Sequence, residues 1–151
     1  MQIRELMSKS VVSITPEESA ALAARLLTRH NLGMLPVCGQ DGRLVGVVTD
    51  RDIVTRCLAA GQDPSRVPVE DIMTRELETL SPQEEGEAAL ARMAGCQVRR
   101  LPVVEEGKVV GVLSLADLAR SRRYEAEAAQ ALCQISESLV RRRRKMRRND
   151  L

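Results

Sequence analysis

The chain has 151 residues, 44% of them hydrophobic, which is enough to bury one core of ordinary size or two small units that share one. It contains one tyrosine and no phenylalanine or tryptophan, so the core must be aliphatic, and stacking of nucleic-acid bases on aromatic rings is nearly excluded. The net charge of +2 is unevenly spread, because residues 121–151 carry 9 Lys/Arg against 4 Asp/Glu and the rest is therefore net acidic.

Neither the start of the chain nor its apolar runs indicate secretion or a membrane. The first residues, MQIRELMSKS, lack the apolar stretch of a signal peptide. No apolar run approaches the roughly 20 residues that a membrane-spanning helix needs. We therefore expect a cytoplasmic protein without membrane insertion. A zinc site is not expected, because His30 is the only histidine and no CxxC pair is present. The cysteines are predicted to be reduced thiols: Cys38, Cys57, Cys96 and Cys133.

The sequence contains an internal repeat. Three segments recur at an offset of 66 residues: 5–8 with 71–74, 14–16 with 80–82, and 35–37 with 101–103. A turn that is one residue shorter in the second copy lowers the offset to 65, so that Val45-Gly46-Val47 matches Val110-Gly111-Val112. We predict one domain at 1–63, a second at 64–120, and a C-terminal segment at 121–151.

In each copy, the first predicted helix follows a proline-containing capping box. The boxes are Thr15-Pro16-Glu17-Glu18 and Ser81-Pro82-Gln83-Glu84, and we expect a helix to start directly after each. In the first copy, Gly33 is expected to end this helix in a left-handed conformation. One helix face carries apolar residues with a histidine at the core edge, to which we assign no chemistry: Leu22, Ala23, Leu26, Leu27 and His30.

A hairpin and a second helix complete each copy. Leu35-Pro36-Val37 and the β-branched run 44–48 flank a glycine-bearing turn, which is typical of a hairpin. The second helix is predicted from Thr49 to about Ala60. The order strand, helix, strand, strand, helix predicts an α/β (α+β) fold. Because roughly 50 to 60 residues bury a core poorly alone, the two copies are expected to pack on each other.

The two copies are closely similar where the hairpin meets the second helix. GVVTDRD at 46–52 returns as GVLSLAD at 111–117; we call these the Asp52 box and the Asp117 box. A hydroxyl with an acid three residues later is what a helix N-terminus favours, so both boxes could be helix caps alone. The alternative is a ligand site, in which the hydroxyl donates to a phosphate and the carboxylate accepts from two sugar hydroxyls. The hydroxyl and acid pairs are Thr49 with Asp52 and Ser114 with Asp117.

These features resemble a tandem pair of cystathionine-β-synthase (CBS) domains, also called a Bateman module. The resemblance covers roughly residues 1–120 and rests on Met7-Ser8 and Met73-Thr74, on the two Leu-Pro-Val segments, and on the two boxes. It implies two three-stranded sheets with two helices each, packed sheet to sheet about a pseudo-twofold axis. The two resulting clefts would bind adenosine-containing ligands: AMP, ADP or ATP, or else S-adenosylmethionine or a dinucleotide such as NAD(H).

The resemblance also implies a role for each part of the box. Asp52 and Asp117 would accept hydrogen bonds from ribose hydroxyls, and Thr49 and Ser114 would contact ribose or phosphate. Adenine would lie against backbone and aliphatic side chains, for which the candidates are Gly46, Val47, Gly111 and Met34.

The resemblance further implies that the two clefts differ. Each cleft would join the box of one copy to the Leu-Pro strand of the other. Arg99 and Arg100 precede the second such strand, so they would grip phosphate beside the Asp52 box, unless they are merely a solvated strand edge. Met34 precedes the first strand without any charge, so the cleft of the Asp117 box would bind phosphorylated ligands more weakly.

Nothing in the sequence indicates catalysis. It contains no P-loop, no histidine beside a nucleophile and no metal-binding cluster. We therefore expect a regulatory module and not an enzyme, which senses a ligand and passes its occupancy to an unidentified effector protein. A module that only dimerises, with empty clefts, is the alternative.

The C-terminal segment begins with an amphipathic pattern of about five helical turns. It needs a partner, so it either folds back on the module or pairs with its twin in a homodimer, the oligomer that the resemblance implies. Cys133 lies near the apolar stripe, which consists of Tyr124, Ala128, Ala131, Leu132, Ile135 and Leu139.

An arginine-rich run, RRRRKMRR, follows this pattern. Such blocks are either solvated arms or contacts for polyanions, and any binding of nucleic acid would be electrostatic and weakened by salt. Nucleic acid or an acidic protein is therefore a second candidate partner. The charged residues are Arg141, Arg142, Arg143, Arg144, Lys145, Arg147 and Arg148.

Overall fold

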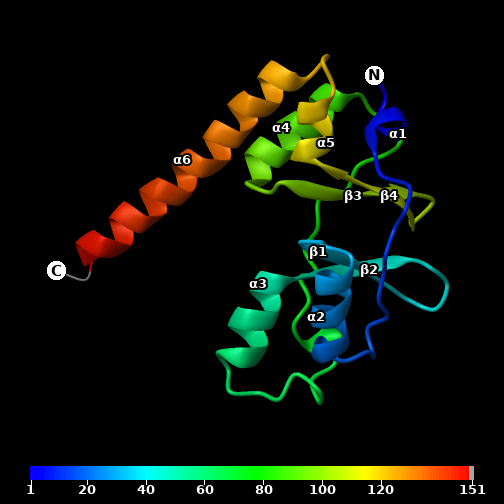
Figure 1. Ribbon diagram of the computed structural model, residues 1–151, viewed down its shortest axis with the longest axis vertical. Coiled ribbons are helices and arrows are strands. Elements are labelled where there is room, and N and C mark those ends of the chain that lie inside the picture. Colours follow the sequence, from blue (N-terminus) through cyan, green and yellow to red (C-terminus); the bar gives the residue numbers. More distant parts are fainter. Residues whose placement is uncertain (150–151) are drawn as a thin grey trace. The chain divides into compact units, whose positions relative to one another are not determined.

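The computed structural model describes the backbone of residues 1–149 and the side chains of residues 1–137 (Figure 1). The chain is a mixture of helices and short strands, as the sequence predicts. It divides into two compact units, and each unit contains parts of both repeats. Unit 1 comprises Met1–Lys9, Glu78–Val103 and Gly111–Leu151, and unit 2 comprises Ser10–Leu77 and Val104–Val110. The domain boundaries predicted above stay a prediction.

Each unit contains the longer helices and most of the hairpin of one repeat, together with the beginning of the other repeat, and unit 2 also includes the tip of the second hairpin. The elements of the first repeat are α1 (Ile3–Leu6), α2 (Ala20–Arg29), β1 (Met34–Cys38), β2 (Leu44–Thr49), α3 (Asp50–Asp52) and the π-helical η1 (Ile53–Leu58). Those of the second repeat are the 3₁₀ turn η2 (Val69–Asp71), α4 (Gly86–Cys96), β3 (Arg100–Glu105), β4 (Lys108–Ser114) and α5 (Leu115–Arg120), followed by α6 (Glu125–Asn149).

The predicted hairpins are confirmed, whereas the third strand of each sheet is reduced to a single bridge. β1 pairs with β2 in antiparallel fashion, and β3 pairs with β4. Beside β1, Ile14 forms one parallel bridge: its N–H donates to the Pro36 carbonyl at 3.0 Å, and its carbonyl accepts from the Cys38 N–H at 2.9 Å. Leu80 bridges Val103 in the same way beside β3.

The beginning of each repeat packs into the unit of the other repeat. We call residues 3–8 and 69–74 the head segments. Within unit 2, the N–H and carbonyl of Thr74 exchange hydrogen bonds of 2.8 and 3.0 Å with Val47 of β2. Within unit 1, Ser8 and Val112 of β4 exchange bonds of 2.9 and 3.0 Å. The head segments therefore extend both sheets at the edge opposite the parallel bridge.

The helix α2 begins after the predicted box, but the prediction that this box caps it, with Pro16 as the first helical residue, is wrong. Residues 15–18 form a turn, and the helix begins only at Ala20, capped by the Ser19 side chain, which accepts from the Leu22 N–H at 3.1 Å. The reason is a distant partner: the carbonyls of this turn accept from the head segment at 69–74 instead of from a following helical turn. Those bonds are Glu70 N–H to Pro16 O at 3.0 Å and Val69 N–H to Glu18 O at 2.8 Å.

The same arrangement is found in unit 1, where the predicted box does not cap α4. α4 begins at Gly86, because the carbonyls of Pro82 and Glu84 accept from Arg4 and Ile3 of the other head segment at 3.1 and 2.8 Å. A proline turn with a hydroxyl before it and an acid after it is thus a docking site for a head segment, not a helix start.

The predicted end of α2 is also wrong. The left-handed residue is Asn31, with φ of 51°, and not Gly33. Its counterpart Gln97 closes α4 with φ of 59°. Asparagine tolerates this region better than most residues, since its short amide can bond to the local backbone. His30 is exposed beside this turn and not at the core edge.

The cores are aliphatic, as the composition predicts. In unit 2 the buried side chains that pack together come from one face of the hairpin, from α2 and η1, and from the head segment and the residues next to these elements: Ile14, Ala20, Ala23, Leu27, Leu35, Val37, Val48, Ile53, Cys57, Val67, Val69, Ile72 and Met73.

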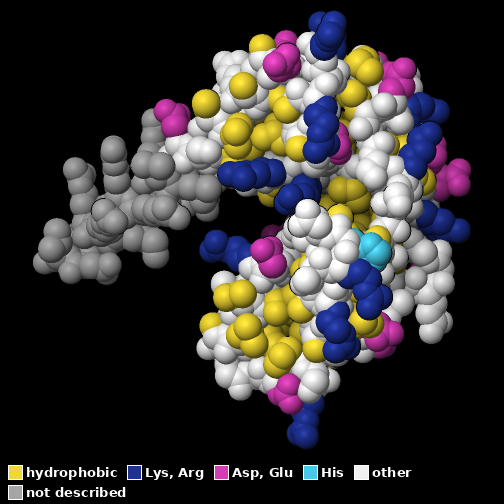
Figure 2. Space-filling view, viewed as in Figure 1, with side chains coloured by type: hydrophobic (Ala, Val, Ile, Leu, Met, Phe, Trp, Pro, Cys, Tyr) yellow, Lys and Arg dark blue, Asp and Glu magenta, His cyan; other side chains and the backbone are white. Residues whose placement is uncertain are grey.

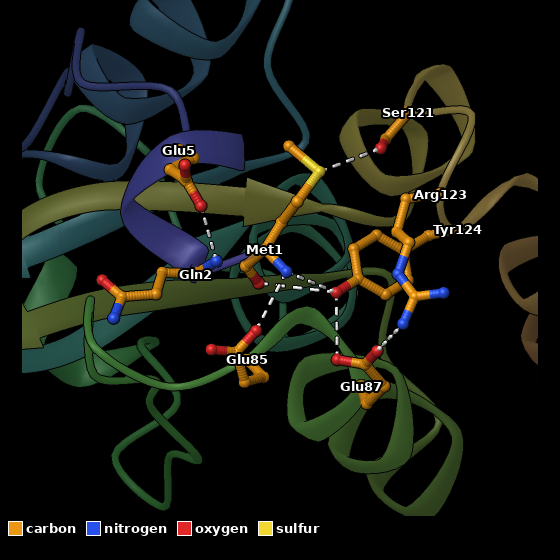
Figure 3. A network of polar contacts seen from close by, with 8 residues as sticks. All are labelled: Met1, Gln2, Glu5, Glu85, Glu87, Ser121, Arg123 and Tyr124. Atoms are coloured by element: carbon orange, nitrogen blue, oxygen red, sulfur yellow. Dashed lines mark hydrogen bonds and ion pairs between the residues drawn. The ribbon is translucent and has the colours of Figure 1, made fainter.

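Unit 1 adds the single aromatic residue to its core. Tyr124 is 1% exposed and packs on Gly86, where an added Cβ would lie 2.6 Å from the ring. Figure 3 shows the Tyr124 hydroxyl directed at Glu87, to which it donates at 2.9 Å. Burial, together with this hydrogen bond, raises the pKa of Tyr124 above its ordinary value of 10.0. Arg123 joins the same carboxylate at 3.2 Å, so the start of α6 is fastened to the start of α4.

Helix α6 folds back on unit 1, which is one of the two partners considered for its stripe, and pairing in a homodimer stays a prediction. It packs against α4 and α5, as Figure 1 shows. Of the predicted stripe, Leu132 is 41% exposed, and the residues that are buried are Tyr124, Ala128, Ala131 and Ile135. The helical backbone continues to Asn149, beyond the predicted five turns.

The proposed polyanion contacts at 141–148, and Leu139, lie outside the described side chains. On the face drawn in Figure 2, the described lysines and arginines are spread over the surface and do not gather into one basic patch. Among the described residues, no helix is long and apolar enough to span a membrane.

Candidate functional site

The Asp52 box forms a reciprocal cap at the junction of β2 and α3. The Thr49 hydroxyl accepts from the Asp52 N–H at 3.1 Å, and an Asp52 carboxylate oxygen accepts from the Thr49 N–H at 3.1 Å. The helix-cap interpretation is therefore confirmed. A carboxylate has about four lone-pair sites and a hydroxyl keeps one donor, so the cap leaves capacity on both groups for a ligand.

Among the described residues, Asp52 is the one charged residue that is buried, with 6% of its surface exposed. Burial of a carboxylate is unfavourable unless it is paired and hydrogen-bonded. The Thr74 hydroxyl lies 3.3 and 3.4 Å from its two oxygens, and Arg56 Nε lies 3.8 Å from Oδ1. Two groups besides the cap thus hold this carboxylate in place.

The Asp117 box makes the same cap in unit 1 but has a more open acid. The Ser114 hydroxyl accepts from the Asp117 N–H at 3.0 Å, and the carboxylate accepts from the Ser114 N–H at 2.9 Å. Arg120 pairs with the second oxygen at 3.2 Å. The Asp117 side chain is 22% exposed against 9% for Asp52, so solvent reaches it more readily.

The glycine of each box serves the fold. A Cβ on Gly46 would lie 2.8 Å from the Met73 sulfur and 2.9 Å from the Thr74 carbonyl. A Cβ on Gly111 would lie 2.5 Å from the Met7 sulfur and 2.9 Å from the Ser8 carbonyl. The glycine thus lets the head segment pair with the strand, and this close approach of the chain to itself explains the residue type without a ligand.

The predicted site residues fall into two groups. In unit 2, β1 pairs Met34 directly with Thr49, and the box residues Gly46 and Val47 are buried in β2 beside them. In unit 1, the box lies next to the predicted arginine pair through the backbone: the Leu115 N–H donates to the Arg99 carbonyl at 2.7 Å. Both side chains of Arg99 and Arg100 are exposed. The predicted clefts combine residues of different units, and that combination stays a prediction.

Two residues of the Asp52 site were not predicted. Arg56 follows Asp52 at helical spacing of four, a signal for an ion pair that the sequence does contain. Its guanidinium also donates to the carbonyls of Met73 and Ile72 at 2.9 and 3.3 Å, which only the fold reveals. Thr74 was matched to Ser8 by the repeat, but nothing in that match indicates a contact with the acid.

Neither the thiols nor the acids assemble a metal site in the described part of the chain, where no three His, Cys, Asp or Glu side chains come together. The four cysteines are free, and two of them, Cys38 and Cys57, are buried. Burial raises the pKa of the Cys38 thiol, against a smaller opposing effect of a hydrogen bond with Ser13. Burial therefore favours the thiol over the thiolate, which is the nucleophilic form.

Known proteins of similar sequence and fold agree with this architecture. Hypoxic response protein 1 of Mycobacterium tuberculosis is 37% identical over 86% of this chain and 92% of its own length. The crystal structure of that protein with two coordinated zinc ions has a TM-score of 0.74 and covers 80% of this chain and 98% of the other.

Two further solved structures hold adenosine compounds. The CBS domain protein PAE2072 from Pyrobaculum aerophilum, complexed with AMP, is 28% identical with a TM-score of 0.76, over 86% of this chain and 99% of the other. The CBS domain pair of protein MJ0100, in complex with 5′-methylthioadenosine and S-adenosyl-L-methionine, is 29% identical with a TM-score of 0.72, over 80% and 94%.

The family model named CBS domain matches the chain twice, at residues 3–59 and 69–124. Each match contains one head segment, one hairpin and one box. The chain therefore belongs to the CBS domain family, of which it carries a tandem pair.

Proposed function

We propose that the protein is a regulatory module that binds an adenosine nucleotide and passes its occupancy to a partner protein. The observation that carries the proposal is the pair of boxes, in which a hydroxyl and a carboxylate stand side by side at equivalent places and both retain hydrogen-bonding capacity. The adenosine compounds bound by two CBS-domain neighbours support the class of ligand. No catalytic role is proposed for either box.

In this proposal the two acids hold the ribose. Asp52 and Asp117 accept from its hydroxyls, while Thr49 and Ser114 donate to ribose or phosphate. AMP, ADP and ATP are the first candidates, and S-adenosylmethionine and NAD(H) are the next. Adenine lies against backbone and apolar side chains, which suits a chain with one aromatic residue.

We further propose that phosphate preference differs between the boxes. Arg99 and Arg100 are exposed, and neither forms an ion pair with another described side chain. They are therefore available to a phosphorylated ligand of the Asp52 box, whereas Met34 offers the Asp117 box no charge. Removing a real phosphate contact weakens binding at least about tenfold, since a charge-assisted hydrogen bond contributes roughly 1.5 to 3 kcal/mol.

The module acts on another protein as a homodimer in this proposal. The described part of the stripe on α6 is buried at Tyr124, Ala128, Ala131 and Ile135, whereas Leu132 is exposed. The cytoplasm is the proposed compartment.

Calorimetric titration tests the ligand proposal. The purified protein is titrated with AMP, ADP, ATP, S-adenosylmethionine and NADH, beside Asp52→Ala and Asp117→Ala. Binding of a phosphorylated ligand that is lost mainly in Asp52→Ala, and weakened in Arg100→Ala, is the expected result. Heat from none of the five ligands, with folded protein, would leave a dimerising scaffold as the function.

The arginine-rich run is a second candidate site because it carries seven positive charges in eight residues. Its expected partner is a polyanion, bound without sequence preference. Deletion of residues 141–151 should abolish retention on DNA and RNA at low salt. Unchanged retention after the deletion would remove this candidate.

A further inference from the structure

The Asp52 carboxylate is attached to the head segment of the second repeat as well as to its own helix. The Thr74 hydroxyl reaches both carboxylate oxygens, at 3.3 and 3.4 Å. Arg56, which lies 3.8 Å from the same carboxylate, donates to the carbonyls of Ile72 and Met73. The buried acid of the box is therefore linked to residues 72–74, directly at Thr74 and through Arg56 at Ile72 and Met73. This segment continues through Leu77 into the part of the chain that belongs to unit 1.

The Asp117 carboxylate has no such attachment among the described residues. Its partners are the Ser114 N–H of its own box and Arg120 of its own helix. Ser8 is the counterpart of Thr74, since it pairs with β4 as Thr74 pairs with β2. Ser8 lacks the γ-methyl group of threonine, and the residue is exposed. Among the described residues, its side chain forms no hydrogen bond with Asp117. The link from acid to head segment is thus specific to the Asp52 box.

The Thr74 contact is long enough to be displaced by a ligand. Hydroxyl to oxygen hydrogen bonds usually measure about 2.7 to 2.8 Å, so a single proton divided between two oxygens at 3.3 and 3.4 Å is a weak bond. One carboxylate oxygen already accepts from the Thr49 N–H. Two ribose hydroxyls that donate to this carboxylate would use the lone pairs that Thr74 now shares.

We propose that the Thr74 hydroxyl reports ligand occupancy at Asp52 to the head segment of the second repeat, because a bound ribose displaces it from the carboxylate. The inference rests on the proposed function, since it requires a ligand at Asp52. Coupling of two binding events is reciprocal: if the ligand weakens the Thr74 contact, the Thr74 contact weakens ligand binding. Thr74 is a positioning residue of this site, and its contact with Asp52 lowers the affinity for the ligand. Arg56 holds the adjacent carbonyls of Ile72 and Met73 in place.

The test combines calorimetry with amide hydrogen exchange on the full chain, with AMP and S-adenosylmethionine as probes. Thr74→Val removes the hydroxyl and keeps the shape of the side chain, Thr74→Ser retains the hydroxyl, and Ser8→Ala is the matched control in unit 1. AMP should bind about twofold more tightly to Thr74→Val, the lower end of the range for one hydrogen bond, and with unchanged affinity to Ser8→Ala.

Exchange at residues 72–77 gives the second readout. AMP should change it in the wild type and in Thr74→Ser, and should leave it unchanged in Thr74→Val. Weaker or equal AMP binding by folded Thr74→Val, or a ligand response at 72–77 that persists in it, would overturn the inference while the ligand site stands. If the wild type binds none of the five ligands titrated above, the proposed function fails as well, so the two failures are distinguishable.

Discussion

The Asp52 box and the Asp117 box each make the same two cap hydrogen bonds, and all four measure between 2.9 and 3.1 Å. Their surroundings differ. Asp52 is buried against Thr74 and Arg56, whereas Asp117 is partly exposed and paired with a surface arginine of its own helix. The repeat thus preserves the local cap, which neighbouring residues determine, and varies the tertiary contacts, which distant residues determine. Two sites with the same cap, but with acids that differ in burial and in partners, can respond differently to a ligand.

The units around the boxes differ in a second way. In unit 1, α6 covers α4 and α5 with a buried stripe that begins at Tyr124. In unit 2, no described element takes that place, and Val54 and Leu58 of η1 are 54% and 52% exposed. The stability of unit 1 should therefore depend on the C-terminal helix, and that of unit 2 should not.

The largest effect on stability is expected from replacing Tyr124, which joins α6 to unit 1. Tyr124→Ala should lower the free energy of unfolding by about 3 to 5 kcal/mol, because it leaves a cavity over Gly86 and removes the hydrogen bond to Glu87. Urea denaturation measures the loss, and hydrogen exchange should assign it to α4 and α5. Leu132→Ala, on the exposed side of α6, should change stability by less than about 0.5 kcal/mol. Equal losses in both units would contradict the account.

A smaller and symmetric effect is expected at the two glycines. Gly46→Ala and Gly111→Ala each place a methyl group less than 3 Å from a head-segment sulfur and carbonyl. Each should lower stability by about 1 to 3 kcal/mol, the usual range for overpacking, and the two losses should be similar. Denaturation of the two variants side by side checks this. If only one glycine resists substitution, the head segments are not equivalent.

The smallest effect concerns acid sensitivity in unit 1. A hydrogen bond from Arg92 is the main cause that holds the pKa of Glu84 below its ordinary value of 4.5. A carboxyl with a lowered pKa stabilises the fold above its unfolded pKa, and this contribution disappears as the pH falls. The first repeat has Leu26 at the position of Arg92, so unit 2 lacks the pair.

Stability should therefore decrease between about pH 6 and pH 3 by on the order of 1 kcal/mol more in the wild type than in Glu84→Gln. Glu18→Gln, the counterpart in the first repeat, is the control and should not change this dependence. Identical pH profiles of the wild type and Glu84→Gln would show that the ion pair does not contribute.

The sequence predicted what depends on neighbouring residues. Alternation and a glycine-bearing turn identified the β1–β2 hairpin, and a hydroxyl with an acid three residues later identified the helix starts at Thr49 and Ser114. The same cap pattern failed at Thr15 and Ser81, because the carbonyls there bond to a head segment more than 50 residues away in one repeat and more than 75 in the other.

In the candidate site, too, the sequence predicted only the features that depend on neighbouring residues. The box acids and hydroxyls were named from the repeat, but the contact of Thr74 with Asp52 spans 22 residues and leaves no periodic signal. The glycines of the boxes also lie against Met73 and Met7, a contact that the sequence did not indicate. Predictions from the repeat were sound where both copies obey the same local rule, and they could not identify contacts that only one copy makes.

A crystal structure of the protein with AMP tests the central claim most directly, since it locates the ribose. The account predicts its two hydroxyls within hydrogen-bonding distance of the Asp52 carboxylate, with the Thr74 hydroxyl moved away from that carboxylate. AMP bound elsewhere, or a ribose that does not contact either Asp52 or Asp117, would contradict the assignment of the boxes as ligand sites.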